Sequence, residues 1–198
     1  MKKKKGAVFG LGFVIFILVA FIIVFFMLEV YNMFNAKDKA QITMTRAVNV
    51  AMEMSFRDDI IAQTGGTNGI SSINETQAKQ EFYKFLMDDD NGEGLVQSAY
   101  NASRFEKRDT DGNVLYYYIV DELTIDDGLV WNGDGSIDFN KTRTEKEGPR
   151  IEVKGSINMP PLILETYLGN CDASKDYTVS VPFKAVTRNR KEAYRLVR

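Results

Sequence analysis

The chain has 198 residues, with 25 Lys and Arg against 27 Asp and Glu, one Cys and no His. The lack of His excludes Ser-His and Cys-His catalysis and His-ligated metal sites, and a single Cys excludes an internal disulfide. Four Lys precede the first apolar run and every acidic residue follows it, so the remainder carries a net charge near −6, which argues against a nucleic-acid partner.

The first predicted element is an apolar run over residues 7–28, twenty-two residues without a charge, an Asn, a Gln or a Pro. At 1.5 Å per residue this gives about 33 Å of helix, enough to cross a hydrocarbon core of about 30 Å. Residues 2–5 are all Lys, and Lys next to a membrane span stays cytoplasmic. We therefore expect a single-pass protein of the cell membrane, in contact with the lipid bilayer, with a cytoplasmic N-terminus and the C-terminal domain outside. A cleaved signal peptide has a shorter apolar core, so an uncleaved anchor is favoured.

The helical pattern continues beyond the apolar run. Residues 13–64 contain no Gly or Pro, so we expect one helix from about residue 7 to residue 61, with an amphipathic outer part. This organisation divides the chain into residues 1–28, 29–61 and 62–198. A stripe of small or apolar residues must be buried, either against the chain's own domain or against the same helix of neighbouring subunits. The stripe consists of Ala40, Met44, Ala47, Val48, Ala51 and Met54.

The remaining residues predict an α+β domain, with an antiparallel sheet of three to five strands packed on helices. We expect a second helix from Asn74, Glu75 and Thr76 to residue 87, and one further helical turn near residues 95–100. Alternating or apolar segments predict strands at residues 103–108, 114–122, 151–158 and 177–184, and an Asp-Gly pair joins the first two as a hairpin. A Pro-initiated segment at residues 160–169 predicts a short helix.

The best metal candidate lies in the segment of residues 130–141. Asn132, Asp134 and Asp138 match the third, fifth and ninth positions of a twelve-residue calcium loop. Val130 stands where the first Asp belongs, however, and Lys141 where the bidentate Glu belongs. The segment therefore indicates either a weak calcium site or an ordinary polar loop, and no other cofactor is expected.

Glu29 closes the apolar run, where it either marks the membrane boundary or pairs with a cationic group of a neighbouring subunit. The basic leader ending at Gly6, the apolar run, Glu29 and the small residues of the stripe together resemble pilin-like subunits, and most of all the TadE-like minor pseudopilins of tight-adherence pilus systems. The resemblance implies a helix held in the membrane before assembly, a small α+β head outside, and other pilin-like or assembly subunits as partners of the N-terminal helix. Type IV prepilins carry Glu five residues after the processed Gly, where this chain has Leu11, so processing at Gly6 stays open.

Three functions compete on this evidence. The first is a non-enzymatic structural or assembly subunit of a surface filament or secretion apparatus. The second is a membrane-tethered extracellular binding or sensing module, in one version dependent on calcium. The third, an enzyme, is disfavoured because carboxylates are frequent but no spacing singles out an acid/base pair.

Overall fold

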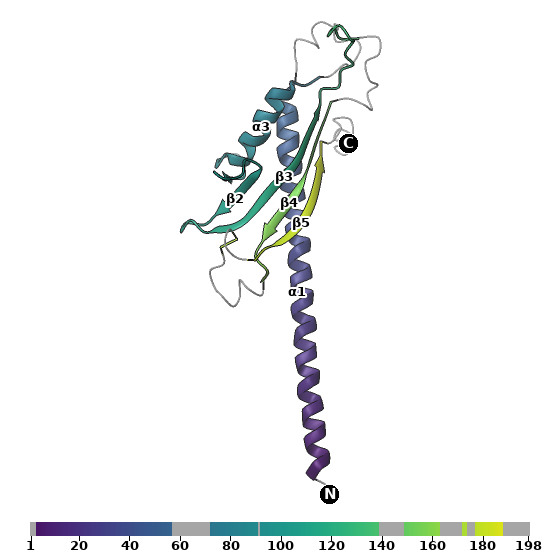
Figure 1. Cartoon of the computed structure of the whole chain (residues 1–198), viewed down its shortest axis with the longest axis vertical. Helices are drawn as coiled ribbons and strands as arrows, with labels where there is room; N and C mark the ends of the chain where they lie inside the picture. Colours follow the sequence, from purple (N-terminus) through teal and green to yellow (C-terminus); the bar gives the residue numbers. More distant parts are fainter. Residues whose placement is uncertain are drawn as a thin grey trace, which may run out of the picture.

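The computed structural model describes residues 3–56, 72–90, 92–138, 149–162, 172–173 and 177–187, with side chains from Gly12 onward. Its α+β architecture confirms the predicted fold class: two helices cover one face of a five-stranded antiparallel sheet with the order β1-β2-β3-β4-β5 (Figure 1). The elements are α1 (Lys3–Met54), α3 (Glu75–Met87), β1 (Val96–Gln97), β2 (Arg104–Arg108), β3 (Val114–Asp126), β4 (Arg150–Met159) and β5 (Val179–Val186).

Helix α1 is a single helix of 52 residues, about 78 Å long. It ends at Met54, so the predicted extension to residue 61 is wrong as far as the described residues reach. The Ser55 hydroxyl donates to the Ala51 carbonyl at 2.6 Å, a side-chain bond that competes with helical continuation. Phe56 then pairs with Ile73 in an isolated antiparallel bridge. The chain therefore leaves the helix axis at Ser55.

One hydrophobic core joins the outer half of α1 to the rest of the chain. The face of α1 with Ala36, Ala40, Ala47 and Ala51 is buried against β4, β5 and α3. The same core contains side chains from α3 and from four of the strands, including Phe82, Phe105, Tyr118, Ile157 and Phe183. The predicted division between residues 29–61 and 62–198 therefore does not separate two packed units, because this part of α1 forms the centre of the head.

The central strand β3 carries a bulge that keeps its apolar residues on the helix side. Register shifts between Val120 and Glu122, so that Val120 and Leu123, three residues apart, both face the helices. Without the bulge, the period of two would turn the Glu122 carboxylate inward. Gly155 of β4 lies opposite Val120, where the backbone of β3 approaches closely.

The shorter elements follow the sequence prediction with one exception. The Asn74 side chain caps α3 by accepting from the backbone N–H of Gln77 at 3.1 Å. Pro182, which suits an edge, lies in the edge strand β5. The helical turn predicted near residues 95–100 is wrong, since Val96 and Gln97 pair with β2 as strand β1. Most of the helix predicted at residues 160–169 lies outside the described residues.

Candidate assembly surface and membrane boundary

The apolar half of α1 lies alone, outside the core. Its large side chains between Phe13 and Leu28 are exposed, Phe26 by as much as 70%. Figure 1 shows this purple half extending away from the sheet, with no other described element beside it. The helix is long and apolar enough to cross a membrane. Gly6, the candidate processing position, lies within the first turns of α1.

Glu29 lies where the bare part of the helix meets the head. Its Oε2 accepts the backbone N–H of Leu162, which follows β4, at 2.9 Å. Its Oε1 is buried and has no hydrogen-bond partner among the described residues. Glu29 precedes Ala36 by two helical turns, so it occupies the helix face that packs on the sheet. The first carboxylate after the apolar run is therefore bound by the chain itself.

The opposite side of α1 is uncovered beyond Glu29. Tyr31, Phe34 and Ile42 are 65%, 62% and 54% exposed, although a water-facing helix side normally carries polar residues there. Charged, exposed side chains lie between and beyond them on the same side. We call this surface the outward face of α1; its members are Tyr31, Phe34, Asp38, Ile42, Arg46 and Glu53. It continues the exposed apolar run without a break in the helix.

The predicted packing stripe faces inward instead. Five of its six members, Ala40, Met44, Ala47, Val48 and Ala51, are fully buried against the chain's own sheet and α3. Of the two possibilities that the sequence left open, burial against the chain's own domain is therefore the one observed, because the sheet and α3 already cover the stripe. Met54 is 60% exposed at the helix end and does not belong to the core.

Sequence reasoning missed Tyr31, Phe34 and Ile42 as candidate contact residues. They are scattered among polar residues in the sequence, so their spacing resembles an ordinary solvent face. They could have been identified because α1 carries large apolar residues on both of its sides. A helix that is covered on one side needs apolar residues only on that side.

The calcium candidate forms a hairpin that closes on itself. Asp134 Oδ1 accepts from the backbone N–H and the hydroxyl of Ser136, at 2.9 and 2.7 Å, and these bonds lower the pKa of Asp134. The Asn132 amide donates to the same hydroxyl at 2.9 Å, and the Asp138 N–H donates to the Val130 carbonyl. No group of three or more Asp, Glu, His or Cys side chains in the described part is placed to hold a metal. Calcium binding stays a prediction, and the hairpin already uses two of the candidate groups.

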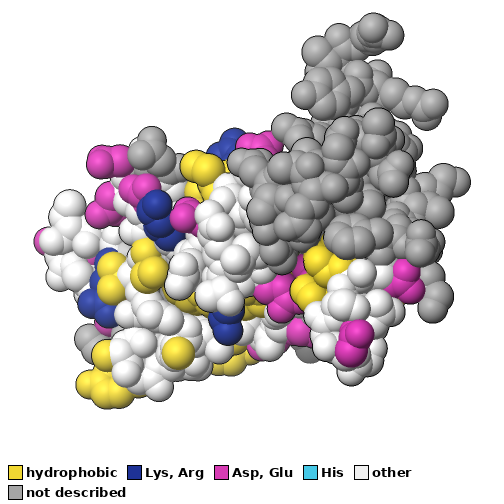
Figure 2. All heavy atoms as spheres, turned by 90° about the horizontal axis from the view of Figure 1, so that it is seen from above, with side chains coloured by type: hydrophobic (Ala, Val, Ile, Leu, Met, Phe, Trp, Pro, Cys, Tyr) yellow, Lys and Arg dark blue, Asp and Glu magenta, His cyan; other side chains and the backbone are white. Residues whose placement is uncertain are grey.

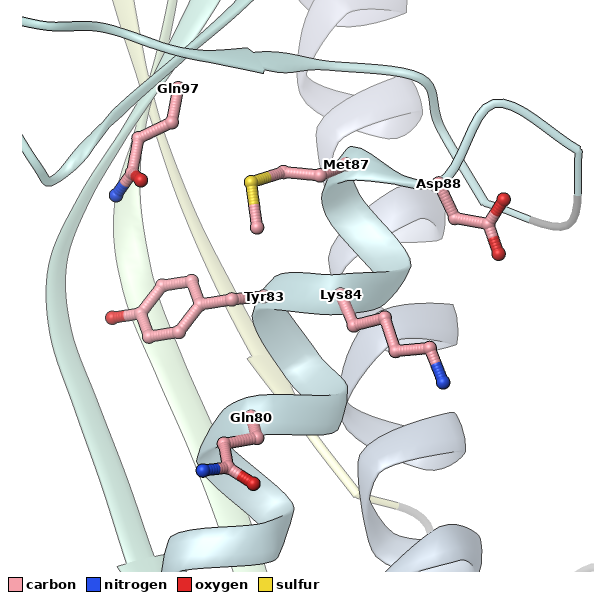
Figure 3. Close-up of a pocket in the computed structure, with 6 residues that line it drawn as sticks. All are labelled: Gln80, Tyr83, Lys84, Met87, Asp88 and Gln97. Carbon is pink, nitrogen blue, oxygen red and sulfur yellow. The ribbon is translucent and has the colours of Figure 1, made fainter.

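A shallow groove of about 600 Å³ runs between α3 and β1. Figure 3 shows Tyr83, Met87 and Gln97 turned toward a common space, and Lys84 and Asp88 also border the groove. The Tyr83 ring stacks on Phe105, with centroids 5.6 Å apart, and burial raises the pKa of the Tyr83 hydroxyl. The groove offers an aromatic edge, a thioether and an amide, which suit a small apolar group with one polar end.

The outer face of the sheet, turned away from α1, carries a ladder of ion pairs. Lys154 Nζ lies 2.7 Å from a Glu122 oxygen, and Lys184 Nζ lies 2.7 Å from a Glu152 oxygen. These lysines lower the pKa of both carboxyls by hydrogen bonding and by charge. Arg150 adds a third pair with Glu152. The ladder pairs both carboxylates and leaves one positive charge in excess.

The end of the molecule opposite the N-terminus is polar and mixed in charge. Figure 2 looks onto this end and shows acidic side chains around much of the described face, with basic and hydrophobic ones between them. A second small hollow lies here, bordered by the start of α3, Asp127 and Trp131. The Trp131 indole donates to an Asp127 oxygen at 2.9 Å, which fixes the ring.

Comparisons with protein families, with curated proteins and with solved structures give no match for this chain.

Proposed function

We propose that this chain is a membrane-anchored structural or assembly subunit, of the kind that pilin-like and TadE-like subunits represent. It joins partner subunits through the apolar run and the outward face of α1. One observation carries the proposal: a single helix is exposed all round in its first half and is covered on only one side in its second half.

The energetics of the outward face support a helical partner. Beyond Glu29 the helix leaves the apolar run, and there Tyr31, Phe34 and Ile42 expose their side chains. Burying a large apolar side chain contributes about 1.5–3 kcal/mol. An exposed apolar row that is rimmed by charges is typical of a protein contact. A partner helix laid along α1 would cover this row, and Asp38 and Arg46 would fix its register through charge.

Within the membrane, exposure of the apolar run costs no free energy, because lipid chains are as apolar as its side chains. The run therefore holds the subunit in the bilayer until partners are available. The four Lys at the N-terminus keep that end cytoplasmic, so the head lies on the outer side.

The proposal is tested by placing a carboxylate on the outward face. Ile42→Glu puts a charge where the partner helix would pack, and Leu115→Glu puts the same charge on another exposed apolar position, on the sheet. Oligomers are trapped by chemical crosslinking in the membranes of the producing cell and quantified by electrophoresis. We expect at least about a tenfold loss of oligomers for Ile42→Glu, since an unpaired buried carboxylate costs more than 1.4 kcal/mol.

Leu115→Glu serves as the matched control and keeps the oligomers of the unmodified chain. Equal loss in both variants would point to a general effect of charge and contradict the assignment of the surface. A chain that is monomeric without any substitution would contradict the function itself.

The groove between α3 and β1 favours a second function, that of a membrane-tethered binding module. It lies on the head, where Tyr83 and Met87 give it an apolar floor. A screen of small aromatic and aliphatic fragments by methyl NMR on the full chain in micelles tests this role. Binding shifts the Met87 methyl signal and leaves that of Met44 unchanged; a screen in which no fragment moves Met87 removes this alternative.

A further inference from the structure

Exposed apolar side chains gather at one edge of the head. Outside α1, the described residues expose six large apolar side chains, which are Met87, Val96, Tyr100, Leu115, Trp131 and Tyr177. The first three belong to the end of α3, to β1 and to the turn that follows β1. Since β1 is an edge strand, no described strand lies beyond it. The head therefore presents an apolar surface at its β1 edge.

Tyr100 lies in the turn that follows β1. Its side chain is 101% exposed, so the ring is not packed against the rest of the chain. The turn itself is held by hydrogen bonds. The backbone N–H of Arg104 donates to the Asn101 carbonyl at 3.0 Å, and the Gln97 amide donates to the Ala102 carbonyl at 2.7 Å. A turn that is already ordered loses little conformational entropy when its exposed ring is buried by a partner.

The groove between α3 and β1 matches the chemistry of a tyrosine side chain. At about 600 Å³ it is large enough to take one aromatic ring. The Tyr83 ring and the Met87 thioether form its apolar floor, and the Gln97 amide supplies a polar group (Figure 3). Thioethers make favourable contacts with aromatic rings, and an amide can hydrogen-bond a phenol hydroxyl. The exposed Tyr100 ring, three residues after Gln97, has the composition that this groove suits.

The groove and Tyr100 lie at the same level of the sheet. Tyr83 stacks on Phe105, with ring centroids 5.6 Å apart. Next to Phe105, the Arg104 carbonyl accepts the backbone N–H of Ser98 from the turn at 2.9 Å. Two copies that cross a bilayer in the same direction can be related by a two-fold axis only if it runs along the membrane normal. Such an axis relates points at one level, so it can serve two reciprocal insertions.

Charge does not oppose a contact between two copies at this edge. Residues 95–103 contain no Asp, Glu, Lys or Arg, although the chain after the apolar run is acidic overall. Lys84 and Asp88, which border the groove, have opposite signs. Like charges that face each other across an interface oppose association. The uncharged β1 edge is therefore a part of the acidic head where a second copy meets little repulsion.

We propose that Tyr100 of one copy inserts into the α3–β1 groove of a second copy, whose own Tyr100 enters the groove of the first. The inference rests on the proposed function, which gathers subunits in one bilayer through α1, and it adds a contact between heads.

The area of this contact fits copies that the membrane already holds together. A buried tyrosine covers about 150–250 Å², so two insertions with the groove surface they cover bury about 600–1,000 Å². A stable complex of free proteins buries about 1,200–2,000 Å². The contact is therefore too small to hold two free copies, and it forms where anchoring in one membrane raises the effective concentration of the heads.

Mixed disulfides between two single-cysteine chains test the insertion. In a Cys171→Ser background, one chain carries Ala99→Cys beside the tyrosine, and the other carries Gln80→Cys at the groove. The two chains bear tags of different size and are produced in the same cell. The membranes are oxidised mildly, and the linked species are separated by electrophoresis. In the control pair, Thr110→Cys, which is exposed in the turn between β2 and β3, replaces Ala99→Cys.

We expect a mixed disulfide between the Ala99→Cys and Gln80→Cys chains, and at least about tenfold less from the control pair. Tyr100→Ser in both chains should reduce the mixed disulfide about tenfold, because a tyrosine buried at an interface is a typical hot spot. Tyr100→Phe should retain it, since the ring supplies most of the buried area. Neither substitution disturbs the fold of one chain, because position 100 is fully exposed.

The outcomes separate this inference from the proposed function. A mixed disulfide that survives Tyr100→Ser, or that the control pair gives equally, overturns the inference. Links only between two Ala99→Cys chains also overturn it, since the turns would then meet without entering the grooves. Ile42→Cys in parallel membranes reports on assembly through α1. Disulfide-linked Ile42→Cys chains without the mixed disulfide overturn the inference and leave the proposed function standing, whereas absence of both contradicts the proposed function as well.

Discussion

Leu162 donates its backbone N–H to Oε2 of Glu29, 2.9 Å away, although the two residues are 133 positions apart in the chain. The contact closes the head against α1 at the point where the apolar run ends. A carboxylate in that position is costly in lipid and accepts hydrogen bonds readily at its surface. Glu29 thus connects the end of the apolar run with the end of the sheet, so that the bare part of α1 and the head are joined at this point.

Ala47→Leu tests whether the packing stripe is buried against the chain's own sheet. Ala47 is fully buried between α1 and the sheet, so a larger side chain overpacks the core, and we expect a loss of about 1–3 kcal/mol in the free energy of unfolding. The neighbouring substitution Arg46→Leu changes an exposed position and should stay within about 0.5 kcal/mol. Urea unfolding of the full chain in micelles measures both. Equal stability of the two variants would mean that the stripe does not face the sheet.

Gly155→Ala tests the close approach of β3 and β4. A methyl group on Gly155 would collide with the Ile119 carbonyl and with the Phe183 ring. Because the carbonyl belongs to the backbone, it cannot move aside, and we expect a loss of about 1–3 kcal/mol. Gly133→Ala, in the polar hairpin, meets no described atom within 4 Å and should be neutral. A Gly155→Ala variant as stable as Gly133→Ala would contradict the strand register at the bulge.

Tyr118→Phe tests a buried hydroxyl. Tyr118 is fully buried next to Phe183 and Tyr116, and its hydroxyl has no hydrogen-bond partner of good geometry among the described residues. Burial raises the pKa of Tyr118, Tyr116 adds to the rise, and the Thr43 hydroxyl opposes it. Removing an unsatisfied hydroxyl relieves a desolvation cost of about 1–3 kcal/mol, so Tyr118→Phe should be neutral or stabilising. A clear loss of stability in thermal unfolding would show that Thr43 bonds this hydroxyl.

The ion pair between Glu122 and Lys154 gives the chain a specific dependence on pH. Hydrogen bonding and charge from Lys154 hold the pKa of Glu122 below its ordinary value of 4.5. A lowered pKa in the folded state stabilises the fold above pH 4.5, and this contribution disappears as the pH falls through the lowered value. Lys154→Met should therefore raise the Glu122 titration midpoint in carboxyl carbon NMR.

Lys184→Met is the matched control for that titration. Lys184 pairs with Glu152, so its removal should raise the Glu152 midpoint and leave Glu122 nearly unchanged. Both effects should weaken in high salt, because the lysine side chains of the two pairs are exposed. A Glu122 midpoint that does not respond to Lys154→Met would contradict the pair.

Much of the fold could be predicted because its signals are local. The apolar run can be predicted from composition alone, and the strands from the alternation of apolar and polar residues. Asn74 caps α3 through a bond that spans three residues. The helix end could not be predicted, because no Gly or Pro stands near residue 54 and α1 ends where the Ser55 hydroxyl bonds the Ala51 carbonyl. Strand β1 was missed because two residues carry no periodicity.

The candidate site was harder to predict because it depends on contacts between distant segments. The spacing of Ala40, Met44 and Ala47 predicts that this side of α1 is covered. The same spacing would result whether a sheet or another helix covers it. Only the assembled sheet shows that these residues are buried by the chain itself, and that Tyr31 and Ile42 are exposed. The Glu29 contact with Leu162 has no local signal at all.

The most direct test of the proposed assembly compares two cysteines on opposite sides of α1. In a Cys171→Ser background, Ile42→Cys lies on the outward face, and Ala40→Cys lies in the core. After mild oxidation of membranes from the producing cell, the account predicts disulfide-linked subunits for Ile42→Cys and none for Ala40→Cys. Linked subunits from Ala40→Cys, or none from Ile42→Cys, would contradict the claim that the uncovered side of α1 binds partner subunits.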